Sequence, residues 1–161
     1  MAGKVQSCRR CQEQGRRAEF EDEVAALRFL DAERCEQSHR FVLEIGGEVV
    51  GFGSVKMASE EYEDEVSVFV ELPFVFIDRA FRGQGRSHAL LEALLDDACG
   101  RLTRMIASHA RGRPVIVRSS SQPESDAGEV FLRRFEARLF GFACSQGARM
   151  TGRTLPLEGS L

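Results

Sequence analysis

Apolar residues recur with a helical period in three segments of the chain. The spacing predicts amphipathic helices over residues 19–37 and 87–109, and a third helix that starts at Asp126 with Glu129 as a capping-box partner and stops at Gly141. The second helix is rich in leucine, and its periodic positions are Leu90, Leu91, Leu94, Leu95, Ala98, Leu102, Met105 and Ile106.

Strand-forming residues dominate the segment between the first two predicted helices. Residues 40–45 and 49–57 flank Gly46-Gly47, which predicts an antiparallel hairpin with a two-residue turn. A further strand is expected over 66–77. Pro73 interrupts it, and because proline cannot donate to a sheet ladder, an edge position or a bulge is expected there. A bulge would splay the strand end and open a cleft.

The last third of the chain predicts a strand over 114–118 and a terminal hairpin. Its arms would be residues 142–145 and 148–157, on either side of Gln146-Gly147. A short strand is also expected before the first helix. Helices and strands therefore alternate as in a mixed α/β sheet layered with helices, and the length suits one domain over 1–161.

Composition favours a cytoplasmic protein. No segment is long and apolar enough for a membrane span, and no apolar signal-peptide core is found near the start. Five cysteines, an odd number without a regular framework, fit a reducing compartment. Cys8 and Cys11 have C-x-x-C spacing, but no second pair completes a zinc site, so no metal is expected. No membrane partner is expected either.

The charges are unevenly distributed although the net charge is only -3 and the pI about 5.7. Nucleic acid is not expected as a partner, because phosphate binding needs clustered cations. An acidic run and a basic region stand out in the sequence, and solvated surface is sufficient to explain both of them. The alternative is that the acidic run attracts a cationic ligand, while the basic region binds an acidic partner or RNA. The acidic run comprises Glu60, Glu61, Glu63, Asp64 and Glu65; the basic region comprises Arg101, Arg104, Arg111, Arg113 and Arg118.

The most informative stretch is Arg82-Gly83-Gln84-Gly85-Arg86-Ser87, which joins the strand 66–77 to the leucine-rich helix. The first N–H groups of a helix lack intrahelical partners and face the positive end of its dipole. Glycines at 83 and 85 allow φ > 0 and a close approach of the backbone to an anion. The junction therefore predicts a site for a phosphate-bearing cofactor.

Residues 76–87, with Leu90-Leu91 after them, resemble the acyl-CoA-binding motif of the GNAT superfamily of N-acyltransferases, Gln/Arg-x-x-Gly-x-Gly/Ala. Arg82 and Gly85 match the motif, and Ser87 takes the place of its last small residue. The segments 47–52 and 137–142 are also similar to the family. The resemblance implies a mostly antiparallel central sheet with a splayed strand pair, layered by helices. It covers about residues 40 to 145.

The resemblance also implies acetyl-CoA as the cosubstrate. Backbone N–H groups of Gly83, Gln84, Gly85, Arg86 and Ser87 would bind its pyrophosphate, and Arg82, with Arg86, would add positive charge. The pantetheine arm would pair with the backbone of Phe76 and Ile77 like an extra strand.

Glu71 is the candidate general base, because it lies on the same predicted strand, and some protein-acetylating members of the family carry a glutamate at the matching place. Its pKa would have to be raised by burial. The alternative is that Glu71 points to solvent. The family's tyrosine on the last helix is replaced by Ala137, so Tyr62, a water or Cys144 remain candidates for the acid that protonates the thiolate.

These features together predict an acyltransferase that moves an acetyl group from acetyl-CoA to a primary amine by direct attack. The acceptor would be a small molecule or a protein amine, with a cationic acceptor as one option, and a homodimer is possible. The alternative is a non-catalytic acyl-CoA-binding or regulatory module on the same fold, since Ala137 and Ser87 depart from the family pattern. An interaction protein that uses the basic region is disfavoured by the net charge.

Overall fold

The computed structural model describes residues 4–7, 38–109, 112–123 and 125–150. The expected helix over 19–37 and the Cys8–Cys11 pair lie outside these residues. The order of elements is β1 (Lys4–Ser7), β2 (Ser38–Ile45), β3 (Glu48–Glu61), β4 (Val66–Ile77), the 3-10 turn η2 (Arg79–Phe81), α3 (Ser87–His109), β5 (Val115–Ser119), α4 (Asp126–Ser145) and β6 (Arg149–Met150). The short first strand is thereby confirmed.

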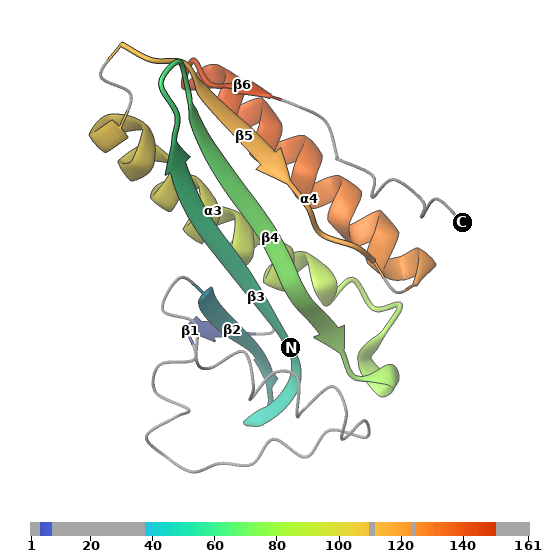
Figure 1. Ribbon diagram of the computed structural model, residues 1–161. Helices are drawn as coiled ribbons and strands as arrows, with labels where there is room; N and C mark the ends of the chain where they lie inside the picture. The colour runs from blue at the N-terminus through green and yellow to red at the C-terminus, as the bar shows by residue number, and fades with distance from the viewer. Residues whose placement is uncertain (1–3, 8–37, 110–111, 124, 151–161) are drawn as a thin grey trace. The chain divides into compact units, whose positions relative to one another are not determined.

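The strands form one sheet in the order β1-β2-β3-β4-β5-β6 (Figure 1). β1 and β2 are antiparallel, as are β2 and β3, whereas β5 runs parallel to β4 and to β6. β3 and β4 run in opposite directions and are joined by a short turn in which Tyr62 N–H donates to Glu65 O at 2.8 Å. The predicted mixed, mostly antiparallel sheet is confirmed.

The fold divides into two compact units. One contains the described residues of 1–56 and 72–98, and the other those of 57–71 and 99–161. In the first unit, α3 packs closely on β3: a Cβ at Gly53 would lie 3.0 Å from Leu94 Cδ1 and 3.4 Å from Leu90 Cδ2. In the second unit, α4 packs against β5 and β6. The apolar side of α4 is Phe131, Leu132, Phe135, Leu139 and Ala143, all buried.

The β2–β3 hairpin forms as the two glycines predict. Gly46 and Gly47 have φ of 64° and 91°, and positive φ at both positions is what a two-residue turn of type I′ requires. β3 continues four residues beyond the expected end at Met57, so Glu60 and Glu61 of the acidic run belong to a strand. The strand over 66–77 and the helix over 87–109 have the predicted bounds.

The last helix begins at Asp126 as predicted, but its predicted capping residue and its predicted end at Gly141 are wrong. Ser125 rather than Asp126 is the N-cap, and its side chain accepts from Gly128 N–H. The helix passes through Gly141 and ends at Ser145. A helical glycine costs about 1 kcal/mol relative to alanine. Leu139 and Ala143 are fully buried on either side of it, and this packing outweighs that cost.

The predicted terminal hairpin is also wrong. Residues 142–145 are helical, and Gln146-Gly147 caps α4 instead of making a turn between strands. Gly147 has φ of 79°, and the N–H groups of Gly147 and Ala148 donate to Cys144 O and Ala143 O, both at 3.0 Å. This is the Schellman arrangement, which closes a helix and reverses the chain. β6 then pairs parallel to β5. No described helix combines the length and apolarity needed to cross a bilayer.

Candidate functional site

The loop between β4 and α3 is shaped by its own side chains. Asp78 caps η2, because its carboxylate accepts from Ala80 N–H at 2.8 Å. The side-chain amide of Gln84 donates back to Ala80 O at 2.9 Å. The sequence suggested only a role for the backbone N–H of Gln84. Its side chain also links two parts of the loop, residues 80 and 84.

Gly83 and Gly85 have φ of 73° and 70°. A Cβ at either position would meet no described atom within 4 Å, so the backbone conformation rather than crowding demands glycine. The N–H groups of Gly83, Gly85 and Ser87 have no hydrogen-bond partner among the described residues. His88 N–H donates to Gly85 O at 3.1 Å. The loop thus presents unsatisfied donors at the start of a 23-residue helix, an arrangement that suits an anion.

Arg82 turns back onto β4. Its Nε donates to Ile77 O at 2.7 Å, and its guanidinium carbon lies 5.5 Å from the centre of the Phe76 ring. Phe76 in turn stacks on Phe52 of β3, with ring centres 5.2 Å apart. Arg82 therefore holds the exposed loop to the end of the strand in addition to contributing charge. Arg86 and Ser87 follow as half-buried residues.

The end of β4 lies very close to β3. A Cβ at Gly51 would be 2.8 Å from both Phe76 O and Ile77 Cδ1, a separation that real side chains do not tolerate. Asp78 N–H donates to Val50 O at 2.8 Å just beyond. Gly51 therefore fixes where the half-buried residues Phe76 and Ile77 can lie. In the sequence, Gly51 stood out only as part of a segment similar to the family and had no role of its own.

Glu71 is half-buried on β4, at the point where pairing with β5 stops. The last paired residues are Val70 and Ser119, after which β5 ends while β4 continues. Ser120 Oγ donates to Glu71 Oε1 at 2.8 Å. The carboxylate therefore accepts a hydrogen bond from Ser120 just beyond the last paired residues, where the predicted separation of a strand pair begins.

A second carboxylate lies at the end of β5, on α4. Ser119 Oγ donates to Glu136 Oε1 at 2.7 Å, and both residues are buried. Sequence reasoning missed Glu136. The available signal was its place beside Phe135, within the apolar side of the helix.

Neither side chain suggested for the general acid is confirmed in that role. Tyr62 donates from its hydroxyl to Glu60 Oε2 at 2.5 Å, and this bond raises the pKa of Tyr62. The phenol is thereby a weaker acid than usual. Cys144 is an exposed free thiol on α4, and Ala137 is exposed on the same helix. Among the described residues, no group of three His, Cys, Asp or Glu side chains could hold a metal.

The acidic run and the basic region, which the sequence presents as separate features, pair with each other. Glu61 accepts from Arg113 Nη2 at 2.5 Å and lies 2.8 Å from His109 Nδ1, and Arg118 Nη2 is 3.0 Å from Glu65 Oε1. The hydrogen bonds from Arg113 and then from His109 lower the pKa of Glu61. Arg113 and Arg118 of the basic region are thus paired with carboxylates of the same chain. His109, like the exposed His88, lies on the surface of α3.

The lowered pKa of Glu61 predicts a loss of stability in acid. The folded-state pKa lies below the ordinary value of 4.5, so the pairing stabilises the fold fully above that value and loses its effect as the pH falls through the lowered pKa. We expect Glu61→Gln to lower the urea midpoint at about pH 6 and to have a smaller effect as the pH is lowered below 4.5. Glu48→Gln, at an exposed position, is the control. An equal effect of Glu61→Gln at pH values above and below 4.5 would contradict the pairing.

The chain is similar to known proteins at the level of family and of fold. The family model described as Acetyltransferase (GNAT) family matches residues 6–112. No curated protein matches the chain. Among solved structures, the aminoglycoside acetyltransferase AAC(6')-Iy in complex with the bisubstrate analog CoA-S-monomethyl-acetylneamine is similar at 16% identity and a TM-score of 0.51, covering 100% of both chains. A mutant of the toxin AtaT, bound to the C-terminus of the antitoxin AtaR and acetyl-CoA, is similar at 13% identity and a TM-score of 0.50, covering 83% of each chain. At these identities the structural matches show a shared fold.

Proposed function

Because the chain belongs to the acetyltransferase (GNAT) family, we propose that it transfers an acetyl group from acetyl-CoA to a primary amine of a cationic acceptor. The observation that carries this proposal is the loop Arg82–Ser87. Its two glycines at positive φ and its unsatisfied N–H groups lie at the start of a long helix. Membership of an acetyltransferase family confirms the prediction of an acyltransferase.

The loop fits the pyrophosphate of acetyl-CoA. The N–H groups of Gly83, Gly85 and Ser87 would donate to its oxygens, and the positive end of the α3 dipole would favour its charge. No described side chain lies within 4 Å of a Cβ built at either glycine. Arg82 is held nearby by Ile77 O, so its charge is positioned before the ligand arrives. The AtaT structure with acetyl-CoA is consistent with this ligand.

The pantetheine arm would lie along the last residues of β4. Phe76 and Ile77 are half-buried there, and Gly51 holds this strand end against β3. Ile77 O already accepts from Arg82, and a carbonyl oxygen has a second lone pair for a further donor. The carbonyl of Ile77 therefore remains able to accept from an amide of the arm.

Glu71 would accept the proton of the attacking amine. An ammonium cannot attack a carbonyl, so one proton must leave before the new C–N bond forms and another when the product becomes a neutral amide. The thioester supplies the activated acetyl group when acetyl-CoA is bound. The hydrogen bond from Ser120 orients the carboxylate of Glu71. The second proton passes to water and the thiolate leaving group takes one from water, so that a neutral amide and the free thiol of CoA are formed.

Two measurements test this function. Acetyl-CoA is expected to raise the melting temperature of the protein, because a ligand of the native state stabilises it. Thiol release is then followed across a panel of amines. A thermal shift without release by any amine would favour the non-catalytic acyl-CoA-binding module that Ala137 suggests. The absence of any shift would contradict the assignment of the loop.

A further inference from the structure

Two neighbouring serines at the end of β5 each donate to a carboxylate. Ser119 Oγ donates to Glu136 Oε1 at 2.7 Å, and Ser120 Oγ donates to Glu71 Oε1 at 2.8 Å. All four residues belong to one of the two compact units. The proposed function uses only the second of these bonds, so the buried Glu136 has no part in it.

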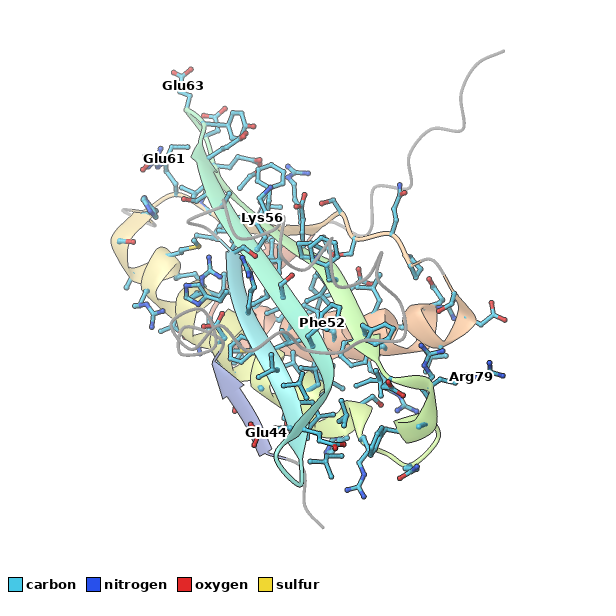
Figure 2. The ribbon with its side chains drawn as sticks, turned by 90° about the horizontal axis from the view of Figure 1, so that it is seen from below. Glu44, Phe52, Lys56, Glu61, Glu63 and Arg79 are labelled. Carbon is cyan, nitrogen blue, oxygen red and sulfur yellow. The ribbon has the colours of Figure 1, made fainter. Side chains whose placement is uncertain are left out.

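The two bonds lie on opposite faces of the sheet. β4 leaves the hairpin tip at which Figure 2 shows Glu63, and its last residue paired with β5 is Val70, opposite Ser119. Side chains alternate along a strand, so Glu71 lies on the other face from Val70 and Ser119. α4 contacts β5 and supplies Glu136 on the face of Ser119. The end of β5 is therefore tied to a carboxylate on each side of the sheet.

The sheet itself does not hold Ser120. In the part of the chain that the structure describes, pairing between β4 and β5 ends at Val70 and Ser119, and Ser120 is the first residue beyond it. The backbone position of Ser120 therefore follows from that of Ser119. A hydroxyl bonds a carboxylate well only at about 2.5 to 3.0 Å, so a small displacement of the end of β5 would break the bond to Glu71.

The bond between Ser119 and Glu136 is suited to prevent such a displacement. Ser119 is 4% exposed and Glu136 is 9% exposed. A buried hydroxyl or carboxylate without a partner costs free energy, so the two groups hold each other in place. Glu136 lies beside Phe135 on the apolar side of α4, where an apolar residue of similar size would avoid the desolvation of a carboxylate. Packing alone therefore does not explain a glutamate at this position.

We infer that Glu136, through Ser119, is a positioning residue of the acetyl transfer: from α4 it fixes the end of β5 and thereby the Ser120 hydroxyl that orients Glu71. This inference rests on the proposed function, because it takes Glu71 as the base. In this role Glu136 exchanges no proton with the amine or the thioester. It acts on the rate because a base must stand within hydrogen-bond distance of the proton that it accepts.

Glu136→Ala is expected to lower kcat about fivefold to tenfold, the size of one lost hydrogen bond at the base, and to leave the Kd for acetyl-CoA nearly unchanged. Ser119→Ala removes the same bond from the other side and should have the same effect, so it carries the test if Glu136→Ala does not fold. Glu136→Gln keeps an oxygen that accepts from Ser119 and should retain most of kcat. The rates are measured at saturation with an amine that the panel shows to be accepted.

A double-mutant cycle with Ser120→Ala separates positioning from other roles. Ser120→Ala alone should lower kcat by a similar factor. In the Ser120→Ala protein, Glu136→Ala should lower kcat by less than about twofold more, because the bond through which Glu136 acts is already gone. An undiminished effect of Glu136→Ala in that protein would overturn the inference, as would a Glu136→Gln protein that is as impaired as Glu136→Ala.

Leu102→Ala is the control for lost stability. Leu102 is fully buried on α3 in the same compact unit, and its truncation leaves a cavity. It should lower the melting temperature and keep kcat at temperatures at which every variant is folded.

Hydrogen exchange supplies a readout that does not depend on turnover. Exchange of the segment 117–121, measured by mass spectrometry, should become faster in Glu136→Ala and not in Leu102→Ala. Unchanged exchange in Glu136→Ala would overturn the inference. Loss of the thermal shift by acetyl-CoA would instead remove the proposed function, so the two failures can be told apart.

Discussion

Replacing Gly85 by glutamate is expected to weaken acetyl-CoA binding about a hundredfold or more. The φ of 70° at this position costs a residue with a Cβ about 1 to 2 kcal/mol. The new carboxylate would also stand among the N–H donors at the start of α3, where it would compete with and repel a phosphate. Losing two charge-assisted hydrogen bonds accounts for the expected size. Calorimetric titration with acetyl-CoA measures it.

Gly112→Glu provides the matched control. Gly112 also has positive φ, at 85°, and a Cβ there meets nothing within 4 Å. It precedes β5 and is not part of the loop. Both variants should lose similar stability, while only Gly85→Glu should lose acetyl-CoA binding. A Gly85→Glu protein that still binds acetyl-CoA normally would refute the assignment of the loop to the pyrophosphate.

Glu71→Gln should lower kcat at least a hundredfold and leave the Kd for acetyl-CoA nearly unchanged. An amide keeps the size of the side chain and can still bond Ser120, but it cannot accept the proton of the amine. General-base catalysis contributes about 10² to 10⁴ in rate, which sets the expected size. The measurement is kcat against pH, together with an acetyl-CoA titration, using an amine that the panel shows to be accepted.

The matched variant is Glu44→Gln, since Glu44 is also half-buried on a strand and lies on β2. It should keep normal kcat. If Glu71→Gln retained both turnover and the shape of the pH profile, Glu71 would not be the base. Glu136, the buried carboxylate bonded to Ser119, would then be the next residue to replace.

Much of the fold follows from local sequence patterns. Gly46-Gly47 specifies a turn with positive φ at both positions, which glycine adopts without steric cost, and the β2–β3 hairpin forms around it. The spacing of the leucines is a local pattern, and it was sufficient to predict the bounds of α3, Ser87–His109. The loop Arg82–Ser87 was identifiable for the same reason, because its glycines and the helix start are neighbours in the chain.

Features that depend on distant contacts could not be found in this way. Gly141 has the usual identity of a helix stop, yet packing on both sides keeps it helical, and Gly147 ends α4 instead. Ser120 meets Glu71 across 49 positions, and Arg113 meets Glu61 across 52. No local rule selects these partners from the many serines, arginines and carboxylates of the chain.

Several expectations from the sequence remain predictions. These are a single domain over residues 1–161, a cytoplasmic location, the possible homodimer and the roles of individual site residues. A single cooperative unfolding transition by calorimetry and by far-ultraviolet circular dichroism would support the single domain.

The cap at Gly147 has a consequence for the order of folding. By reversing the chain after α4, it makes β5, α4 and β6 a crossover unit, in which two parallel strands are joined through the helix between them. The β2–β3 hairpin closes a loop of two residues, whereas β5 and β6 close one that contains all of α4. Because closure entropy grows with loop length, the hairpin should form early and β6 should dock late. The chain would thus complete its sheet from the middle outward.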